Sequence, residues 1–353
     1  MKLFGIIALA ILNVACFVSA APRQKTDNGE FVFYITSGTG SNEHENKADI
    51  YGLSSKNKYA TDITIPPYFE IQNQRYYTKT IMSGAFSNSS IETVTFKSGS
   101  DMIYVEDSAF SNCKNLKTIK IYTPNLMVEN DSFSGCNPIE FDGWATRSLI
   151  QRLAEKLVKE WNLPVNDSSY ERAIEENADK KMKDLYTLAK YIRKNFKNDN
   201  ENTKYGMNLA SVLIFRKVSN RGIHMLFREL ALAMGINEYS MNTAGDGRDN
   251  FWSFVRFYCG NKKYAWYNAD LYYFNFDKNG DNYDRFFQTN YQFENYLKAN
   301  LGSKYSSSVD QYPSKWLIYE TRYGFPYDNA YVDKADLFDD FLAKKFKNPE
   351  TRL

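Results

Sequence analysis

The stretch SAFSNCKNLKTIKI, residues 108–121, carries the pattern that decides the fold of the first half of this chain. Its phenylalanine, Phe110, comes before three aliphatic residues, Leu116, Ile119 and Ile121, which alternate with polar residues. Such alternation predicts a short strand with one buried face. Phe110 would fill the core behind that strand.

Two further copies of this pattern flank the stretch. SGAFSNSSIETVTF occupies residues 83–96, and the shorter DSFSGCNPIEF occupies residues 131–141. The marker phenylalanines Phe86, Phe110 and Phe133 are 24 and 23 residues apart. A period in this range is typical of a solenoid, because one coil cannot bury its own apolar face and neighbouring coils must cover it. We therefore expect the three phenylalanines to stack inside the solenoid.

These repeats resemble the BspA-type leucine-rich repeat, whose hallmark is Ala-Phe-x-x-Cys-x-x-Leu-x-x-Ile. The resemblance covers residues 60–142, where residues 62–66 (DITIP) and 79–81 (KTI) are similar to a worn first coil. It implies a short β-solenoid that recognises proteins or surfaces and carries no chemistry. The segments that should form parallel neighbouring strands are those ending at Phe96, Ile121 and Phe141.

The chain has 4 cysteines, and two of them, Cys113 and Cys136, fall at one position of successive coils. They should therefore be stacked neighbours. A ladder of two buried thiols is the interpretation that the resemblance favours, and a disulfide between them is the alternative. Cys259 comes before Gly260 at a predicted hairpin turn, and not at a helix start, so we predict no reactive role for it.

Residues 1–20 are predicted to be a signal peptide, because one lysine precedes an uncharged run over residues 3–18 and small residues end the segment. No second long apolar run follows, so we expect no membrane span after cleavage. The protein would then be secreted and extracellular, or held at the cell surface. Lys+Arg 44 against Asp+Glu 42 gives a net charge of +2, which argues against a nucleic-acid partner.

Helix and strand patterns border the repeats on both sides. Residues 21–59 form a polar N-terminal segment with a strand-like run, FVFYI, at residues 31–35. Residues 143–164 show helical spacing and end at Pro164, so we predict a connector helix that covers the open end of the solenoid. A capping box at residues 168–171 (SSYE) then predicts the start of a long helix. Its apolar face would contain Leu185, Leu188 and Ile192.

Three blocks of the second half stand out, at residues 220–236 (NRGIHMLFRELALAMGI), 250–252 (NFW) and 260–270 (GNKKYAWYNAD). In order and spacing they resemble the transglutaminase-like family, which shares the fold of papain-type acyl-transfer enzymes. The family patterns are Cys-x-Gly-Tyr-Ala-x-Leu-Phe-x-x-Leu with Arg-Ala-x-Gly-Ile, His-Ala-Trp, and Gly-x-x-Trp-Tyr-x-x-Asp. The resemblance covers residues 168–275 and implies a transglutaminase-like α+β domain over residues 165–310.

The resemblance also implies a catalytic triad, and two of its three positions are replaced. The nucleophile position holds Asn220 and the base position holds Asn250, whereas the orienting carboxylate remains as Asp270. An amide side chain is neither a nucleophile nor a base at neutral pH, and losing either partner of a comparable triad lowers turnover about a millionfold. We therefore predict a pseudo-enzyme whose three side chains converge within about 6 Å. A histidine or cysteine within that cluster would favour an active enzyme instead.

These residues also have structural interpretations. Asn220 is a suitable N-cap for a helix, and Asp270 could bond to a backbone amide or to Trp252. A relocated catalytic site that uses Ser219 and His224 is the alternative that would keep the domain active.

Other candidate sites are weaker. Trp252 and Trp266 are expected to line the former cleft, and surface aromatics could bind carbohydrate. Residues 275–280 (NFDKNG) are faintly similar to a calcium loop, but Phe286 stands where the bidentate acid is required, so no metal and no cofactor are predicted. The surface aromatics are Tyr272, Tyr273 and Phe274. The candidate N-glycosylation triplets begin at Asn88, Asn130 and Asn166.

The sequence therefore predicts an α+β protein in which a leucine-rich-repeat β-solenoid joins a transglutaminase-like domain. The C-terminal extension, residues 311–353, has no functional pattern that we can assign. The leading hypothesis is a non-catalytic, secreted or cell-surface recognition protein that binds a protein or a glycan. The competing hypothesis is an active acyl transferase or peptidase with a relocated catalytic site.

Overall fold

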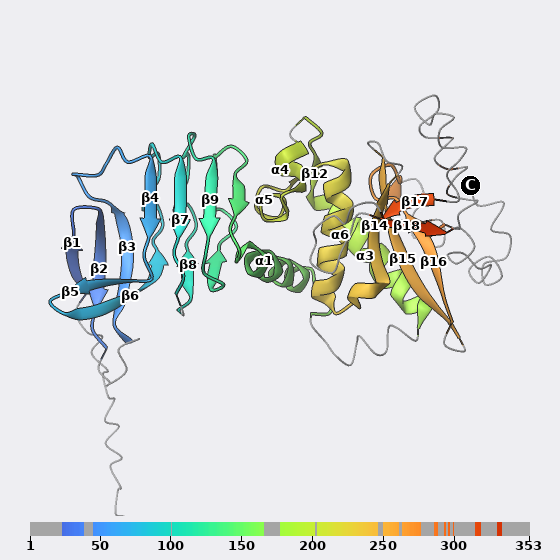
Figure 1. Cartoon of the computed structure of the whole chain (residues 1–353), viewed down its shortest axis with the longest axis horizontal. Helices are drawn as coiled ribbons and strands as arrows, with labels where there is room; N and C mark the ends of the chain where they lie inside the picture. Colours follow the sequence, from blue (N-terminus) through green and yellow to red (C-terminus); the bar gives the residue numbers. More distant parts are fainter. Residues whose placement is uncertain are drawn as a thin grey trace, which may run out of the picture.

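In a computed structural model, the two halves of the chain form separate sheets joined by helices (Figure 1). The predicted signal peptide, the capping box at residues 168–171 and Asn166 lie outside the residues that the structure describes. The described residues are 23–38, 45–99, 101–165, 177–201, 203–245, 250–260, 263–276, 286–288, 293, 296, 299, 315–318 and 330–333.

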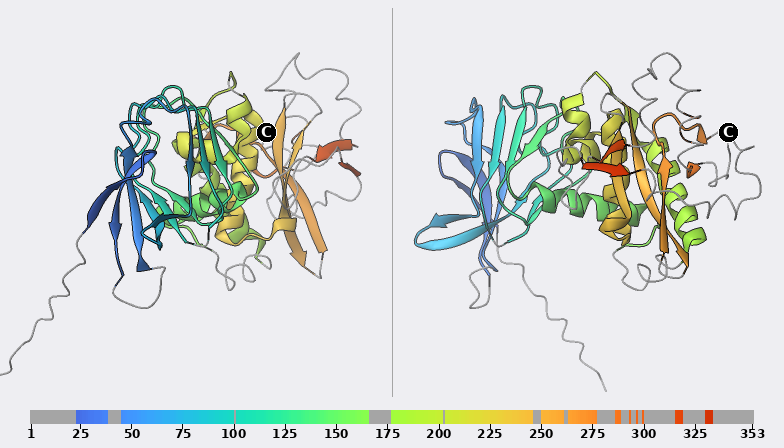
Figure 2. Two further views of the ribbon diagram at one scale, coloured as in Figure 1. Left: turned by 60° about the vertical axis from the view of Figure 1, so that its left-hand side comes forward. Right: turned by 45° about the vertical axis from the view of Figure 1, so that its right-hand side comes forward.

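Within these ranges, the first half consists of two sheets that enclose one apolar core (Figure 2). One sheet has the strand order β1 (Gln24–Asp27), β2 (Phe31–Thr36), β3 (Lys47–Leu53), β6 (Gln74–Ile81), β8 (Ile103–Val105) and β10 (Leu126–Val128), with β5 (Tyr68–Ile71) paired to β6. The other has the order β11 (Glu140–Asp142), β9 (Thr118–Ile121), β7 (Thr93–Phe96) and β4 (Asp62–Ile65).

The repeat has the stacked geometry that its period predicted. β7, β9 and β11 are parallel neighbours, and β4 extends them in parallel as the worn first coil. The ring centroids of Phe86 and Phe110 are 5.0 Å apart, and those of Phe110 and Phe133 are 5.3 Å apart. All three rings are buried. The predictions of parallel strands and of an internal phenylalanine stack are therefore confirmed.

The two cysteines of the repeats occupy equivalent places in successive coils. Cys113 Sγ donates to the carbonyl oxygen of Phe86 at 3.0 Å, and Cys136 Sγ donates to that of Phe110 at 3.0 Å. Both thiols are free, unlike the disulfide alternative, and Cys113 is buried as predicted whereas Cys136 is only partly buried. Ser89 takes the same place one coil earlier, with its Oγ 3.3 Å from the Sγ of Cys113.

The polar N-terminal segment folds as the first edge of the solenoid. β1 and β2 form an antiparallel hairpin, β2 pairs with β3, and β3 runs parallel to β6. The strand-like run at residues 31–35 lies in β2, where Phe31 and Phe33 are fully buried. The ring of Phe31 packs edge-on against Phe86, at 6.1 Å. The segment thus closes one end of the repeat core.

The predicted connector helix is α1 (Thr146–Glu160), which lies between the two halves (Figure 1). Toward the last coil, the Nζ of Lys156 lies 2.6 Å from a carboxylate oxygen of Glu129. Toward the second half, Arg147 pairs with the buried carboxylate of Glu229. The helix therefore covers the open end of the solenoid and attaches it to the second half. Its buried residues are Leu149, Leu153, Ala154, Leu157 and Val158.

The second half combines helices with a five-stranded sheet, among the residues described. The helices are α3 (Ala178–Asn195), α4 (Thr203–Met207), α5 (Leu209–Phe215) and α6 (Asn220–Met234), with a short 3-10 helix at Glu238–Ser240. The sheet has the order β16 (Lys263–Ala269), β15 (Phe251–Gly260), β14 (Met241–Gly245), β17 (Lys315–Ile318) and β18 (Ala330–Asp333). Short strands β12 (Lys197–Asn198) and β13 (Lys217–Val218) pair separately.

The C-terminal stretch set apart as an extension contributes to this sheet. β17 pairs with β14, and β18 pairs with β17, both antiparallel. Residues beyond 310 are therefore joined to the second half by backbone hydrogen bonds. Such bonds do not require a particular pattern of side chains in the sequence.

α6 is the central helix of the second half, packed against α1, α3 and α4 and against β14 and β15. Because it is enclosed on several sides, even His224 on this helix is buried. α3 begins at Ala178 and not at the predicted capping box, because Asn177 is its N-cap and accepts from the backbone N–H of Lys180 at 3.0 Å. The predicted apolar face of α3 is buried and contains Leu185, Leu188 and Ile192.

Candidate functional site

The N-terminus of α6, where the resemblance places a nucleophile, is organised by Ser219. The Oγ of Ser219 accepts from the backbone N–H of Gly222 and donates to the carbonyl oxygen of Gly206, each at 3.1 Å. Asn220 is the first helical residue and not the N-cap, so that structural interpretation of Asn220 is wrong. Ser219 takes the cap because its backbone is extended, with φ −81° and ψ 171°, and its hydroxyl can reach back to the helix.

Gly222 in the same turn has a packing role. A Cβ atom built on Gly222 would lie 1.7 Å from the carbonyl oxygen of Gly206. The two chain segments can approach this closely only because Gly222 has no side chain. Gly222 therefore allows α4 to pack closely against the start of α6.

His224 lies one turn further along α6 and contacts β15, not Ser219. Its Nδ1 is 3.0 Å from the Oγ of Ser253, and its Nε2 is 3.7 Å from the Oδ1 of Asp270. The alternative of a site that pairs Ser219 with His224 is not supported, because the Ser219 hydroxyl is engaged at the helix cap and the His224 ring contacts Ser253. Ser253 is a residue that the sequence analysis missed, and nothing in the spacing of residues 250–253 indicated it.

Asp270 follows β16 directly and shapes the loop after it. Its Oδ1 accepts from the backbone N–H groups of Tyr272 at 2.7 Å and Tyr273 at 3.1 Å. This is the backbone-amide role that the sequence analysis considered for Asp270. The carboxylate thereby orients the loop formed by residues 270–276.

Burial controls the charges of this polar cluster. Desolvation lowers the pKa of His224 to about 3, and the positive charge of Arg193 adds to the effect. Desolvation also raises the pKa of Asp270 to about 6, against the opposing effect of the Tyr273 and Tyr272 amides. At neutral pH, His224 is neutral and Asp270 is ionised. The separation of 3.7 Å between them is too long for a hydrogen bond.

The elements that carry the three triad positions meet at one end of the second half. Asn220 begins α6, Asn250 directly precedes β15, and Asp270 directly follows β16, which pairs with β15. Arg221 and Phe251, the chain neighbours of the two asparagines, are in contact, with the guanidinium carbon 5.6 Å from the ring centroid. Convergence of the three side chains within about 6 Å stays a prediction. A histidine, His224, does lie beside Asp270.

Of the two tryptophans expected to line the former cleft, Trp252 is buried and does not line it. Trp252 is 1% exposed and its ring centroid lies 5.1 Å from that of Phe293, so a ligand cannot reach it. Both faces of β15 are covered at this point, since residues 252–255 are all buried, and this places Trp252 in the core. Trp266 lies on β16, and its side chain is outside the described residues. The same holds for the side chain of Cys259, near the end of β15.

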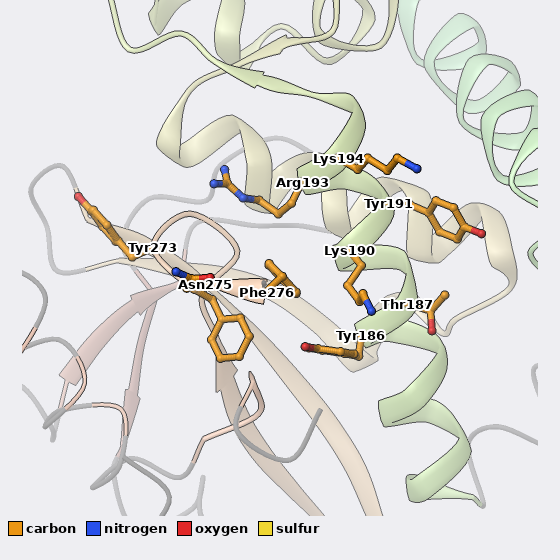
Figure 3. Close-up of a pocket in the computed structure, with 10 residues that line it drawn as sticks. Tyr186, Thr187, Lys190, Tyr191, Arg193, Lys194, Tyr273, Asn275 and Phe276 are labelled. Carbon is orange, nitrogen blue, oxygen red and sulfur yellow. The ribbon is translucent and has the colours of Figure 1, made fainter. Parts of the chain in front are cut away.

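A cleft of about 1080 Å³ lies between α3 and the 270–276 loop. Figure 3 shows Arg193 extending from α3 toward Tyr273 on the loop, with Tyr186 and Lys190 below it on the same helix. No predicted site included this cleft, although Lys190, Arg193 and Lys194 have the i, i+3, i+4 spacing of one helical face.

The remaining predicted sites are distributed over the chain. Asn88 and Asn130, two of the glycosylation candidates, are exposed on the repeat half, and Asn166 is outside the described residues. Across the described residues, no group of three or more His, Cys, Asp or Glu side chains is placed to hold a metal ion. In that same part of the chain, no helix is both long and apolar enough to cross a membrane.

Comparison with known protein families identifies the repeat region of the first half. Residues 61–152 match the BspA type leucine rich repeat region, in 6 copies, so this range is a BspA-type leucine-rich-repeat region. The pneumococcal vaccine antigen PcpA is similar at 12% identity with a TM-score of 0.22, over 34% of this chain and 34% of that one. The chain spans about a third of that protein, and a likeness this weak supports no argument. No curated protein matches. The transglutaminase-like resemblance of the second half stays a prediction.

Proposed function

We propose that this protein is a non-catalytic recognition protein, secreted or held at the cell surface, which binds a protein partner through its leucine-rich repeats. The observation that carries the proposal is the repeat region itself, residues 61–152. Stacked repeats present an extended, regular surface, and proteins built from them use that surface for binding.

The outer face of the sheet that contains β8 is the better candidate for this binding surface. Residues aligned across five strands, from β2 to β10, form one row on it. Tyr104 in this row and Tyr51 beside it are each 49% exposed. Exposed tyrosines are enriched at protein interfaces. The row consists of Tyr34, Asp49, Thr80, Tyr104 and Met127.

The opposite sheet has a different outer face. Its partly exposed residues are threonines and charged side chains, without an exposed aromatic ring among the residues described for its strands. Such a face is well hydrated. Covering it with a protein partner buries less apolar surface and therefore contributes less binding free energy. One aligned row there consists of Thr64, Thr95, Lys120 and Asp142.

The second half would serve as a scaffold related to the transglutaminase-like family that has lost its chemistry. Acyl transfer through a thioester needs a thiolate and an adjacent imidazole. The sequence has Asn220 and Asn250 at these positions. This part of the proposal rests on the sequence blocks and on the order of α6, β15 and β16.

A binding experiment tests the recognition function. Mature protein from residue 21 onward is measured against immobilised fibronectin, laminin and collagen by surface plasmon resonance. We expect at least one of them to bind, and the double substitution Tyr51→Ser with Tyr104→Ser to weaken it at least about tenfold, since interface tyrosines are frequent hot spots. Tyr59→Ser, which removes a tyrosine that is 74% exposed in a loop, is the matched control. Equal binding by both variants, or no binding at all, contradicts the proposal.

A second candidate function is favoured by one observation, the contact of His224 with both Ser253 and Asp270. A serine hydrolase needs these three residue types in contact. The three side chains are 1%, 0% and 3% exposed for Ser253, His224 and Asp270, so no substrate reaches them in this conformation. Incubation with a fluorophosphonate probe separates the candidates. We expect no labelling, whereas labelling that Ser253→Ala abolishes would establish a hydrolase.

A further inference from the structure

The cleft between α3 and the 270–276 loop has a strong positive character. Lys190, Arg193 and Lys194 contribute three cations, and none of the described residues that line the cleft is acidic. The guanidinium of Arg193 donates to the side-chain oxygen of Asn198 at 3.1 Å, which is a neutral partner, and its charge also acts on the buried carboxylate of Asp270. The cleft therefore attracts anions.

Aromatic rings line much of the cleft wall, beside the polar side chains of Thr187 and Asn275. Tyr186 packs against Phe274 and Phe276, with ring centroids 6.3 and 5.4 Å apart. Tyr273 is 37% exposed and lies on the side of the cleft toward which Arg193 extends (Figure 3). An exposed ring beside a cation offers a stacking surface and an ionic contact to the same ligand.

The loop that carries Tyr273 is held in place before any ligand binds. The backbone N–H groups of Tyr272 and Tyr273 both donate to the same carboxylate oxygen of the buried Asp270. The hydroxyl of Tyr272 is bonded in turn to Asn200. A wall fixed by three contacts loses little conformational entropy on binding.

The shape of the cleft decides between two classes of acidic ligand. An extended acidic peptide is usually held by main-chain hydrogen bonds to a strand edge, and the described walls are a helix and a loop. A sugar ring needs a flat aromatic surface and side-chain hydrogen bonds, both of which are present. The volume of about 1080 Å³ is slightly above the roughly 300–1,000 Å³ of small-molecule sites, so it has room for several sugar rings.

We propose that this cleft binds an acidic oligosaccharide, with a carboxylate of the glycan on Arg193 and Lys190 and a sugar ring on Tyr273. The proposal concerns the second half and does not depend on the partner of the repeats. It also gives Asp270 a positioning role in a binding site, by holding the loop that presents Tyr273.

The test uses the mature full chain and three probes, which are tri-galacturonate, neutral maltotriose and hexaglutamate, in isothermal titration calorimetry. We expect tri-galacturonate to bind, maltotriose to bind at least tenfold more weakly, and the affinity for tri-galacturonate to fall with added salt. Lys190→Gln with Arg193→Gln should weaken binding at least about tenfold, since a hydrogen bond to a charged group contributes more than 1.4 kcal/mol. Tyr273→Ala should weaken it several-fold without changing the salt dependence.

Controls distinguish a lost site from a lost fold. Lys56→Gln with Lys97→Gln removes the same two charges from exposed lysines of the repeat half and should leave binding unchanged. Each variant is compared with the parent by thermal melting, and if the double cleft variant melts early, Tyr273→Ala alone decides. Preference for hexaglutamate, unchanged affinity in the cleft variants, or no binding of any probe overturns the proposal. None of these outcomes bears on Tyr51 and Tyr104, so failure here is separate from failure of the recognition function.

Discussion

The Nδ1 atom of His224 lies 3.0 Å from the Oγ atom of Ser253, in a place where solvent reaches neither side chain. Asp270 lies on the other side of the imidazole ring, 3.7 Å from Nε2. Three polar groups from a helix, a strand and a loop are thus buried together. Because burial opposes charge on each titratable group, the stability of the second half depends on pH through His224 and Asp270 in opposite directions.

Acidification should destabilise the variant Asp270→Asn more steeply than the parent between pH 6 and pH 4. His224 has a folded pKa of about 3 and an ordinary value of 6.5, so its contribution is present above pH 6.5 and is lost as the pH falls toward 3. Asp270 has a folded pKa of about 6 and an ordinary value of 3.8, so its contribution is present below pH 3.8 and is lost as the pH rises through 6. In the parent, the two contributions change the free energy of unfolding in opposite directions as the pH falls, each by at most about 1.4 kcal/mol per pH unit.

Urea unfolding at pH 6, 5 and 4 measures this difference. Asn keeps the side-chain oxygen that accepts from Tyr272 and Tyr273, so the loop should survive the substitution. Asp142→Asn removes an exposed carboxylate and is the matched control. If Asp270→Asn and the parent have parallel pH profiles, the buried titration of Asp270 is refuted.

Phe110→Ala should destabilise the repeat half by roughly 3–5 kcal/mol. Phe110 is 0% exposed and stands between Phe86 and Phe133 in the stack, so the substitution opens a cavity that neighbouring coils cannot close. Guanidinium unfolding measures the loss. A change below about 1 kcal/mol would be incompatible with a stacked core.

Gly222→Ala should destabilise the second half by about 1–3 kcal/mol or more, because overpacking forces the backbone to move. The new methyl group would meet the carbonyl oxygen of Gly206, which is part of α4 and not a side chain that can rotate away. Thermal melting of the variant provides the measurement. An unchanged melting temperature would show that α4 and α6 are not in close contact.

Asn220→Cys with Asn250→His should produce faint amine incorporation into a glutamine substrate, where the parent produces none. If the three positions converge as predicted, the substitutions supply a thiolate and a base near Asp270, the carboxylate that the resemblance assigns to orienting the base. Incorporation of a fluorescent amine into casein measures this activity. Each single substitution is the control and should be inactive, since either group alone cannot start acyl transfer. Clear activity in the parent would instead favour the site around His224.

The stacked repeats could be predicted from the sequence because their pattern is local and periodic. Each coil places Phe86, Phe110 or Phe133 at a fixed distance before its strand, so the same short-range rule applies three times. The connector helix α1 was predictable for the same reason, since helical spacing is visible within one segment. These features depend on residues fewer than about 25 positions apart.

The buried cluster and the cleft depend on the tertiary structure. His224 meets Ser253 only because of how α6 is rotated against β15, and Asp270 joins them only through the pairing of β15 with β16. Arg193 and Tyr273 line one cleft although they are 80 residues apart in the chain. Helix rotation and strand register are set by packing over the whole core, and no local pattern records them.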